Sequence, residues 1–299
     1  MEKQFKKALF IVNPYAGKGQ IKNHLLMIVD ILTKAGYMVT VYTTQSRGDA
    51  IQVTKERNRD YDLVVCSGGD GTLDEIVTGM IQSGFHTKIG YIPAGSTNDF
   101  ANSLKLPSTM EKAAKVVVAD HTFACDIGMF NQDVFVYVAA FGIFTEVSYE
   151  TPQEMKNMLG HTAYILEGIK QIQNIKSYHM KVTSDDFVIE GDFIYGMITN
   201  SYSIGGIRNI TGRNVALNDG LFEVTLIKRP NNLIELNKTL VALINENIDA
   251  ECMYSFKTAS LIFESEEEVA WTLDGEFGGN HTRVELLNRQ EAVDIIVEE

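Results

Sequence analysis

A glycine loop with one carboxylate, Ser67-Gly68-Gly69-Asp70-Gly71-Thr72, is the stretch of the sequence best suited to phosphate chemistry. It follows an apolar run, Leu63–Cys66, and precedes a helix-like segment, Leu73–Val77. A strand that turns through glycines into a helix presents bare backbone, free N–H groups and the positive end of the helix dipole to a ligand. Asp70 would repel phosphate unless a cation lay between them, so the loop predicts a metal–nucleotide site. The alternative is a plain strand–helix turn in which Asp70 caps the helix.

Two further loops follow predicted strands in the same way. Asn13–Gly19 comes after the strand Leu9–Val12, and Ala94–Asp99 comes after the strand Ile89–Ile92. Strands and helices alternate here, which predicts a mostly parallel sheet with helices on both faces. Ligands of such sheets bind outside the carboxyl ends of the strands, so the three loops together predict a nucleotide site. Neither GxxxxGK[ST] nor GxGxxG is present, which weighs against a P-loop NTPase and a Rossmann dinucleotide site.

The second part of the chain has a different pattern. From about Ile127, apolar stretches alternate with Gly, Asn and Asp turns, which predicts a mainly antiparallel, β-sandwich-like domain. Two helices are expected within it, His161–Lys176 and Asn232–Asn245. The last apolar run, Val293–Val297, has the character of a central strand that can return to the first domain. We therefore expect an α/β domain of residues 1–126 with residues 286–299, and a larger β domain of residues 127–285.

Composition limits the classes of function. With 45% hydrophobic and 22% charged residues, the 299-residue chain resembles an ordinary soluble globular protein. A net charge of −13 argues against nucleic acid as a partner, because such binding needs a basic face. Cys66, Cys125 and Cys252 lie in or beside apolar runs and are expected in the core of a protein kept in a reducing cytosol. The apolar run Ala8–Val12 is too short for a signal peptide or a membrane span, so a cytoplasmic location is expected.

Four motifs in this order resemble the diacylglycerol kinase catalytic family, and within it the soluble bacterial lipid kinases of the B type. NAD kinases share the second motif, but the four together are more specific. The resemblance extends over nearly the whole chain, including Val147–Pro152 and Asn218–Phe222. The motifs are Asn13-Pro14-Tyr15-Ala16-Gly17, Gly68-Gly69-Asp70-Gly71-Thr72, Gly95-Ser96-Thr97-Asn98-Asp99-Phe100-Ala101 and Leu273-Asp274-Gly275-Glu276.

The resemblance implies a two-domain, NAD kinase/diacylglycerol kinase-like fold that transfers the γ-phosphoryl group of ATP, with Mg²⁺, to a lipid hydroxyl, most simply that of diacylglycerol. It implies Glu276 as the proton acceptor, and Asp70 as a second catalytic group that acts as a magnesium partner rather than as the base. It implies a structural Mg²⁺ at Asp219 and the backbone carbonyls near Ala216 and Leu221, linked through water to Asp70 and Asp126. The nucleotide-binding residues carried over are Asn13, Pro14, Tyr15, Ala16, Gly17, Thr43 (with Thr44 as the alternative), Gly69, Asp70, Gly71, Thr72, Leu73, Asp74, Glu75 and Ser96.

Some positions depart from the family pattern. Ala16 stands where serine is common, Asn218 where aspartate is common, and Asp74 where asparagine is usual. These changes bear on the affinity for Mg²⁺–ATP and remove no proposed catalytic group. Read without the resemblance, Asp274-Gly275 and Asp219-Gly220 are also ordinary turn signals. Two other functions stay open: an NAD kinase acting on a soluble dinucleotide, and a nucleotide- or lipid-sensing protein without catalysis.

A lipid substrate requires contact with a membrane. The segment Met155–Leu159 combines apolar residues with a cation, and it is expected either to rest among lipid headgroups at the inner face of the membrane or to be a packed loop. Strand edges in the second domain could pair in a homodimer. The expected partners are thus ATP, a lipid and, transiently, the membrane surface.

Overall fold

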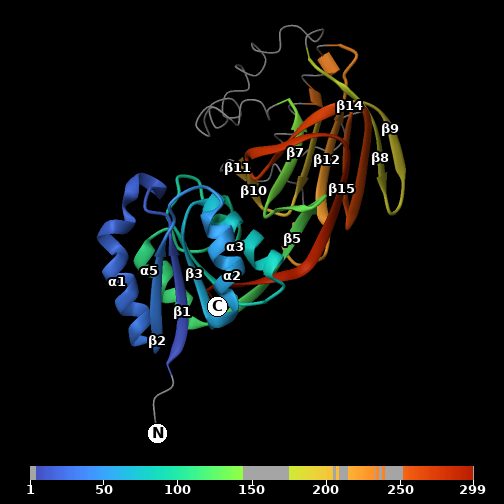
Figure 1. Ribbon diagram of the computed structural model, residues 1–299. Coiled ribbons are helices and arrows are strands. Elements are labelled where there is room, and N and C mark those ends of the chain that lie inside the picture. The colour runs from blue at the N-terminus through green and yellow to red at the C-terminus, as the bar shows by residue number, and fades with distance from the viewer. Residues whose placement is uncertain are drawn as a thin grey trace. The chain divides into compact units, whose positions relative to one another are not determined.

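The computed structural model describes residues 5–143, 175–204, 207–208, 215–232, 234–235, 238–239 and 252–298. The chain divides into two compact units, Met1–Asp126 with Glu291–Glu299, and Ile127–Gln290 (Figure 1). The expected segment Met155–Leu159 lies outside the described residues, as do nearly all of His161–Lys176 and most of Asn232–Asn245. Each unit is considered by itself below.

The first unit alternates strands and helices along the chain, as the apolar periodicity predicts. Its strands are largely buried, except for the edge strand Tyr37–Thr43, which is mostly exposed or half-buried, and its helices each bury one face. The elements are β1 (Lys6–Val12), η1 (Ala16–Gly19), α1 (Ile21–Lys34), β2 (Tyr37–Thr43), α2 (Asp49–Arg57), η2 (Asn58–Asp60), β3 (Leu63–Gly68), α3 (Asp70–Ser83), β4 (Lys88–Pro93), α4 (Asp99–Ser103), α5 (Met110–Ala119) and the start of β5 (Thr122–Phe130).

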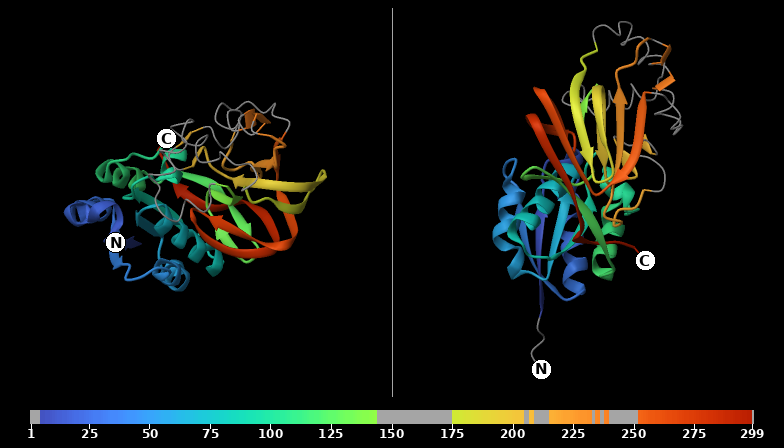
Figure 2. Two further views of the ribbon diagram at one scale, coloured as in Figure 1. Left: turned by 90° about the horizontal axis from the view of Figure 1, so that it is seen from above. Right: turned by 90° about the vertical axis from the view of Figure 1, so that its right-hand side faces the viewer.

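The order of the strands in space explains where the helices go. The sheet runs β2-β1-β3-β4 with all neighbours parallel. The step from β1 to β2 goes one way along the sheet, whereas the steps from β2 to β3 and from β3 to β4 go the other way. Because parallel crossovers are right-handed, α1 must cover one face, and α2 and α3 the other. The packing agrees, since α1 lies beside α5 and α2 beside α3 (Figure 2).

The end of the chain completes this sheet. The long strand β15 (Glu276–Ile296) finishes alongside β4, with Ile295 opposite Ile89 and Ile296 opposite Gly90 in parallel register. Ile295 and Ile296 are fully buried, so the strand fills a central rather than an edge position. The backbone N–H of Val297 then donates to the carbonyl of His121, 2.8 Å away, beside the start of β5.

The second unit is built from antiparallel strands. Its long strands β9 and β14 each pair with β7 over one stretch and with β8 over another. The elements are the end of β5, β6 (Asp133–Phe135), β7 (Val138–Gly142), β8 (Tyr178–Ser184), β9 (Val188–Thr199), β10 (Ser203–Ile204), β11 (Ile207–Arg208), β12 (Phe222–Lys228), β13 (Met253–Thr258), β14 (Ser260–Leu273) and most of β15.

The expected antiparallel pairing is what these strands form, whereas the sandwich-like layering stays a prediction. Their hydrogen bonds link β13, β12, β9, β7, β14 and β15 edge to edge, with β8 paired to β9 and β14, and only β10 and β11 form a separate ribbon within the described part of the chain. Because β9 and β14 each share an edge with both β7 and β8, the pairing branches within this unit. Over the described chain as a whole, antiparallel pairings outnumber parallel ones.

Aromatic side chains make up the centre of this unit. Trp271 is 1% exposed, and its ring centroid lies 4.8 Å from that of Phe141 and 5.2 Å from those of Phe130 and Phe263. Tilted and edge-to-face contacts of this kind are the favoured geometry of aromatic pairs. The three cysteines of the chain are buried as well. Cys66 and Cys125 belong to the first unit, where burial raises the pKa of their thiols.

Candidate functional site

The strand order reverses between β1 and β3, and such a reversal leaves a crevice outside the carboxyl ends of the two strands. The loop after β1 begins at Asn13, the loop after β3 begins at Gly69, and the loop after neighbouring β4 begins at Ala94. The three glycine loops singled out from the sequence therefore start side by side at one edge of one sheet. This edge is the candidate nucleotide site.

Backbone hydrogen bonds carry the sheet pairing into these loops. The N–H of Asn13 donates to the carbonyl of Ser67 over 2.8 Å, and the N–H of Ala94 donates to the carbonyl of Gly68 over 2.7 Å. On the other side, the N–H of Thr44 donates to the carbonyl of Val12 over 2.9 Å. These bonds fix where each loop leaves the sheet, so the side chains that follow are held in register with one another.

The loops then pack backbone against backbone. A Cβ atom added to Gly17, which has a φ of +51°, would lie 1.8 Å from the carbonyl oxygen of Ala94. A Cβ added to Gly95 would lie 2.6 Å from the Cα of Gly69 and 2.7 Å from the side-chain oxygen of Asn98. Only glycine permits this approach. The glycines thus bring the loops together, besides leaving the backbone open to a ligand.

The side chains of Asn13 and Thr72 join the first two loops. The amide Nδ2 of Asn13 donates to Oγ1 of Thr72 over 3.1 Å, and its Oδ1 accepts the N–H of Tyr15 over 3.0 Å. Thr72 is buried and lies against Gly68. A Cβ atom added to Gly68 would lie 2.4 Å from the hydroxyl oxygen of Thr72. The Tyr15 side chain, in contrast, is 82% exposed. Asn13 and Thr72 therefore position the loop backbone, whereas Tyr15 faces solvent.

Asp70 contacts the third loop through its carboxylate. Its oxygens accept the backbone N–H of Asp99 over 3.1 Å and of Phe100 over 3.3 Å. These amides open α4, where an acid is favourable because the first N–H groups of a helix lack partners within it. Asp70 thus caps α4 from the first turn of α3. Its predicted water-mediated link to a metal stays a prediction.

Glu75 has a comparable structural contact. Its carboxylate accepts the N–H of Gly48 over 2.8 Å and of Ala50 over 3.1 Å, at the start of α2. Of the other predicted nucleotide residues, Ser96 is exposed, and Thr43 accepts a hydrogen bond from the side chain of Gln45 over 3.2 Å. Pro14, Ala16, Leu73 and Asp74 lie in or beside the same loops. All the predicted nucleotide residues thus belong to the carboxyl edge of the sheet or to the first turns of the helix that leaves it.

Two residues of this site were missed from the sequence. Asn98 has a φ of +53°, and its side-chain amide clamps Gly95 from both sides, accepting its N–H and donating to its carbonyl, each over 2.9 Å. Gln45 donates to both the hydroxyl and the carbonyl oxygen of Thr43. Asparagine tolerates the left-handed conformation and closes turns with its side chain, so Asn98 could have been found from its place after two small residues.

The predicted base, Glu276, lies in the second unit on a two-residue hairpin turn. Leu273 and Glu276 face each other across β14 and β15, and Asp274 and Gly275 between them have φ values of +51° and +83°. Such paired positive φ angles are typical of tight hairpins. The motif is therefore a hairpin turn with an exposed glutamate at its end, and the role of Glu276 as proton acceptor stays a prediction.

Asp274 anchors that turn. Its carboxylate accepts three consecutive backbone N–H groups, from Val136 over 2.6 Å, Tyr137 over 3.0 Å and Val138 over 2.8 Å. The hydroxyl of Tyr137 also donates to the Asp274 carbonyl over 3.0 Å. Charge-assisted bonds of this kind are roughly twice as strong as neutral ones. Glu276 therefore lies two residues along the chain from Asp274, whose position these hydrogen bonds fix.

The residues predicted to hold a structural metal have a different partner. Asp219 accepts the N–H of Leu221 with Oδ1 over 3.0 Å, and its Oδ2 lies 3.0 Å from the ammonium of Lys257. That ammonium also lies 2.9 Å from a carboxylate oxygen of Glu223. Burial raises the pKa of Glu223 to about 7, against the opposing effect of Lys257. As placed, this cluster fits an ammonium rather than a divalent cation, and no group of three acidic, His or Cys side chains gathers as a metal site among the described residues.

Asp126, the other acid expected near the metal, is fully buried in the first unit. Its Oδ1 accepts the N–H of Glu291 over 2.8 Å, where the final strand returns. The metal ligands Ala216, Asp219 and Leu221, with Asp126 and Asp70 as their water-linked neighbours, stay a prediction.

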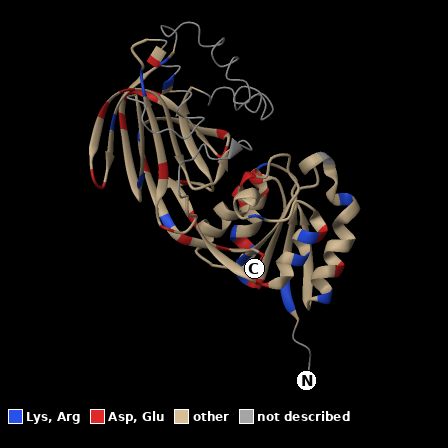
Figure 3. Cartoon of the chain, turned by 180° about the vertical axis from the view of Figure 1, so that it is seen from behind, with Lys and Arg blue, Asp and Glu red and all other residues tan. Residues whose placement is uncertain are grey.

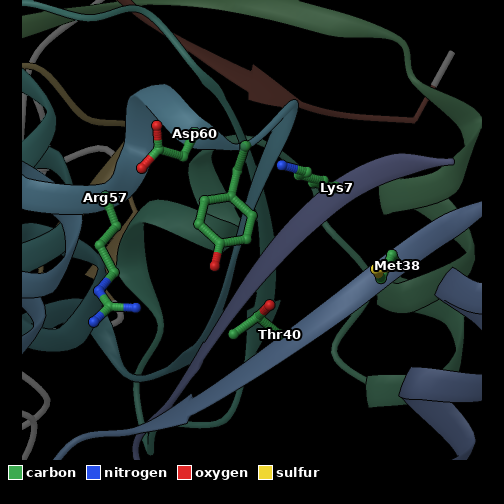
Figure 4. Close-up of a pocket in the computed structure, with 6 residues that line it drawn as sticks. Lys7, Met38, Thr40, Arg57 and Asp60 are labelled. Carbon is green, nitrogen blue, oxygen red and sulfur yellow. The ribbon is translucent and has the colours of Figure 1, made fainter. Parts of the chain in front are cut away.

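A pocket of about 290 Å³ lies elsewhere on the first unit (Figure 4). Lys7 and Met38 are at the amino ends of β1 and β2, and Asp60 lies three residues before the start of β3. This pocket is therefore remote from the loops at the carboxyl edge and forms no part of the candidate site. Its lining residues are Lys7, Met38, Thr40, Arg57, Asp60 and Tyr61.

We expect Gly95→Ala to destabilise the protein by about 1–3 kcal/mol, because the new methyl group would overlap the backbone of Gly69. Gly71→Ala is the matched control, since a Cβ at this helical position meets nothing within 4 Å and removes the entropic cost of glycine, about 0.5–1 kcal/mol. Urea unfolding followed by circular dichroism gives both values. Equal effects of the two substitutions would show that the loops do not pack as described.

We expect Asp274→Asn to lower the free energy of unfolding by about 1–3 kcal/mol. The asparagine amide has one uncharged acceptor oxygen in place of two charged ones, so at least one of the three backbone N–H groups loses its acceptor. Hydrogen exchange at Val136, Tyr137 and Val138 should accelerate. Asp186→Asn, in the exposed turn between β8 and β9, serves as the control. Unchanged exchange at the three amides in Asp274→Asn would contradict the anchoring role.

Comparison with known proteins identifies relatives of the chain. The profile of the family described as the diacylglycerol kinase catalytic domain matches residues 7–130. A Staphylococcus haemolyticus protein named diacylglycerol kinase is 34% identical over 276 residues, which cover 92% of this chain and 83% of that protein. A Bacillus subtilis protein of the same name is 32% identical, over 92% of this chain and 91% of the relative.

Solved structures share the fold. A Bacillus anthracis chain described as a diacylglycerol kinase is 24% identical, with a TM-score of 0.77 over 99% of this chain and 98% of that one. A second chain from the same organism is 27% identical, with a TM-score of 0.80 and the same coverage. With relatives above 30% identity that align over more than nine-tenths of its length, the chain belongs to the diacylglycerol kinase catalytic domain family.

Proposed function

We propose that this protein is an ATP-dependent lipid kinase that phosphorylates the hydroxyl group of diacylglycerol to give phosphatidic acid. One observation carries the proposal. Three glycine loops meet at the reversal point of a parallel sheet, in a chain related over nine-tenths of its length to proteins named diacylglycerol kinase.

Phosphoryl transfer asks the protein for positioning and charge stabilisation more than for covalent chemistry. In the first unit, the loop backbone around Gly69 and the amino end of α3 supply N–H groups for the phosphates of ATP. Asn13 and Thr72 hold that backbone in place, and Asp70 fixes the third loop against it. We propose that ATP enters as its complex with Mg²⁺, which neutralises charge on the transferred group.

Glu276 is the proposed general base. It takes the proton from the lipid hydroxyl as the oxygen attacks the γ-phosphorus, the bond to the β-phosphate oxygen breaks, and ADP leaves. A base acts best when its backbone is fixed, and the hydrogen bonds of Asp274 supply that fixation.

Diacylglycerol lies in a bilayer, so the proposal includes transient contact with the inner face of the membrane. No helix in the described part of the chain is both long and apolar enough to span a bilayer. Lys and Arg are interspersed with Asp and Glu along the described chain (Figure 3). A homodimer through strand edges stays a prediction.

The direct test uses γ-labelled ATP, Mg²⁺ and diacylglycerol in mixed micelles, with NAD offered in a parallel reaction. We expect label in phosphatidic acid and none in NADP, because under this proposal diacylglycerol carries the accepting hydroxyl. Labelled NADP would replace the lipid kinase by an NAD kinase. The absence of transfer to any of a panel of lipids would favour a sensing protein without catalysis.

We expect Glu276→Gln to lower kcat by about 10²–10⁴, the usual contribution of a positioned general base, while ATP binding stays unchanged. Glu266→Gln, an exposed acid on the preceding strand, is the matched control and should retain activity. The measurements are steady-state kinetics in micelles and calorimetric titration with a non-hydrolysable ATP analogue. Near-normal turnover of Glu276→Gln would remove this residue from the mechanism.

A further inference from the structure

A lysine contacts Asp219, one of the residues that the family resemblance assigns to a metal, and the sheet register puts it there. Glu223 and Lys257 face each other directly across the antiparallel pair of β12 and β13. Opposite charges at such positions stabilise strand pairing. Asp219 comes just before β12, in a turn in which the Asp219 carboxylate accepts the N–H of Leu221. Glu223 and Lys257 therefore meet through regular strand pairing, and a turn in which Gly220 has a φ of +76° brings Asp219 to them.

Burial makes a positive partner necessary. The side chain of Glu223 is 5% exposed, and both of its carboxylate oxygens lack a well-oriented hydrogen-bond donor within the described part of the chain. An acid in such surroundings needs a cation beside it, or it must give up its charge. The Lys257 ammonium is the cation that the structure supplies there, 2.9 Å from Glu223 and 3.0 Å from Asp219.

The same position would suit a divalent cation if the lysine were absent. The two carboxylate oxygens that contact the ammonium lie within about 6 Å of each other, and two acids near one point are typical ligands of hard cations. A divalent ion next to Lys257 would instead meet a positive charge at close range. The ammonium and the metal therefore exclude each other at this place.

We propose that Lys257 is the resident cation of this cluster, and that its ammonium takes the position of a structural metal between Asp219 and Glu223. The turn before β12 then needs no divalent ion to keep its fold. The anchoring of that turn by Gln290, whose side-chain amide donates to the carbonyl of Asn218 over 3.1 Å, is likewise independent of a metal.

The test uses the full-length protein without nucleotide or lipid, so its outcome is separate from that of the kinase assay. Thermal unfolding of the native chain is measured in EDTA and across a MgCl₂ series at constant ionic strength. We expect no saturable rise in Tm. Mn²⁺ binding, followed by electron paramagnetic resonance, should show no site that Asp219→Asn removes. Saturable binding of Mn²⁺ that disappears in Asp219→Asn overturns the proposal, whatever the lysine variants do.

Lysine variants test the exchange of cations. Lys257→Met should lose stability in EDTA and regain it as Mg²⁺ enters the vacated position, with a rise in Tm of several degrees. Lys257→Arg keeps the charge and should stay insensitive to Mg²⁺. Lys181→Met, which removes an exposed lysine 3.8 Å from Glu264, is the control and should show no Mg²⁺ response. Stability of Lys257→Met equal to that of the native chain in EDTA overturns the proposal. If Lys257→Met does not fold, Mn²⁺ binding to the native chain still decides.

Discussion

The candidate nucleotide site depends on the close approach of bare backbone from three loops. Gly17 lies against the carbonyl of Ala94, and Gly95 against Gly69, at separations that leave no room for a single methyl group. Strands of a parallel sheet stand about 4.8 Å apart, so loops that leave neighbouring strands must crowd unless their first residues are small. Glycine at these positions lets the loops converge.

Acidic side chains hold this arrangement by binding amides. Asp70 accepts the first N–H groups of α4, Glu75 those of α2, and Asp126 the N–H of Glu291 where the last strand returns. Each bond joins segments far apart in sequence. The carboxylates thus act as fixed acceptors at helix starts and strand ends, in addition to any role toward a cation.

Much of the site followed from local signals in the sequence. Apolar runs, the glycine loops and their order were enough to place Asn13, Gly69 and Ser96 at one sheet edge, because parallel strands always present their carboxyl ends together. The Asp274-Gly275 hairpin was equally visible, since its turn chemistry is local. The contacts that were missed, such as Glu75 to Gly48 and Glu223 to Lys257, join residues 27 and 34 positions apart and depend on packing and strand register.

The order of the strands in the second unit could not be predicted from the sequence, for the same reason. Alternation of apolar residues shows that a strand has a buried face, but it does not say which strand lies beside it. In the second unit, β9 and β14 are long enough to pair with β7 and β8 in succession, and this pairing joins the strands into one sheet. The length of a strand is visible in the sequence, whereas the sharing of its edge is not.

The hairpin of Glu276 shows how a side chain can be exposed while its backbone is held. A glutamate at the tip of an isolated hairpin would move with the turn, since two-stranded hairpins are marginal in water. Here the residue two positions earlier, Asp274, accepts N–H groups from Val136, Tyr137 and Val138, about 140 positions away along the chain. The mobility of the tip is thereby reduced without burying the glutamate. The spacing of the motif matters for this reason, because the aspartate fixes the turn, the glycine allows its positive φ, and the glutamate that follows stays at the exposed end of the hairpin.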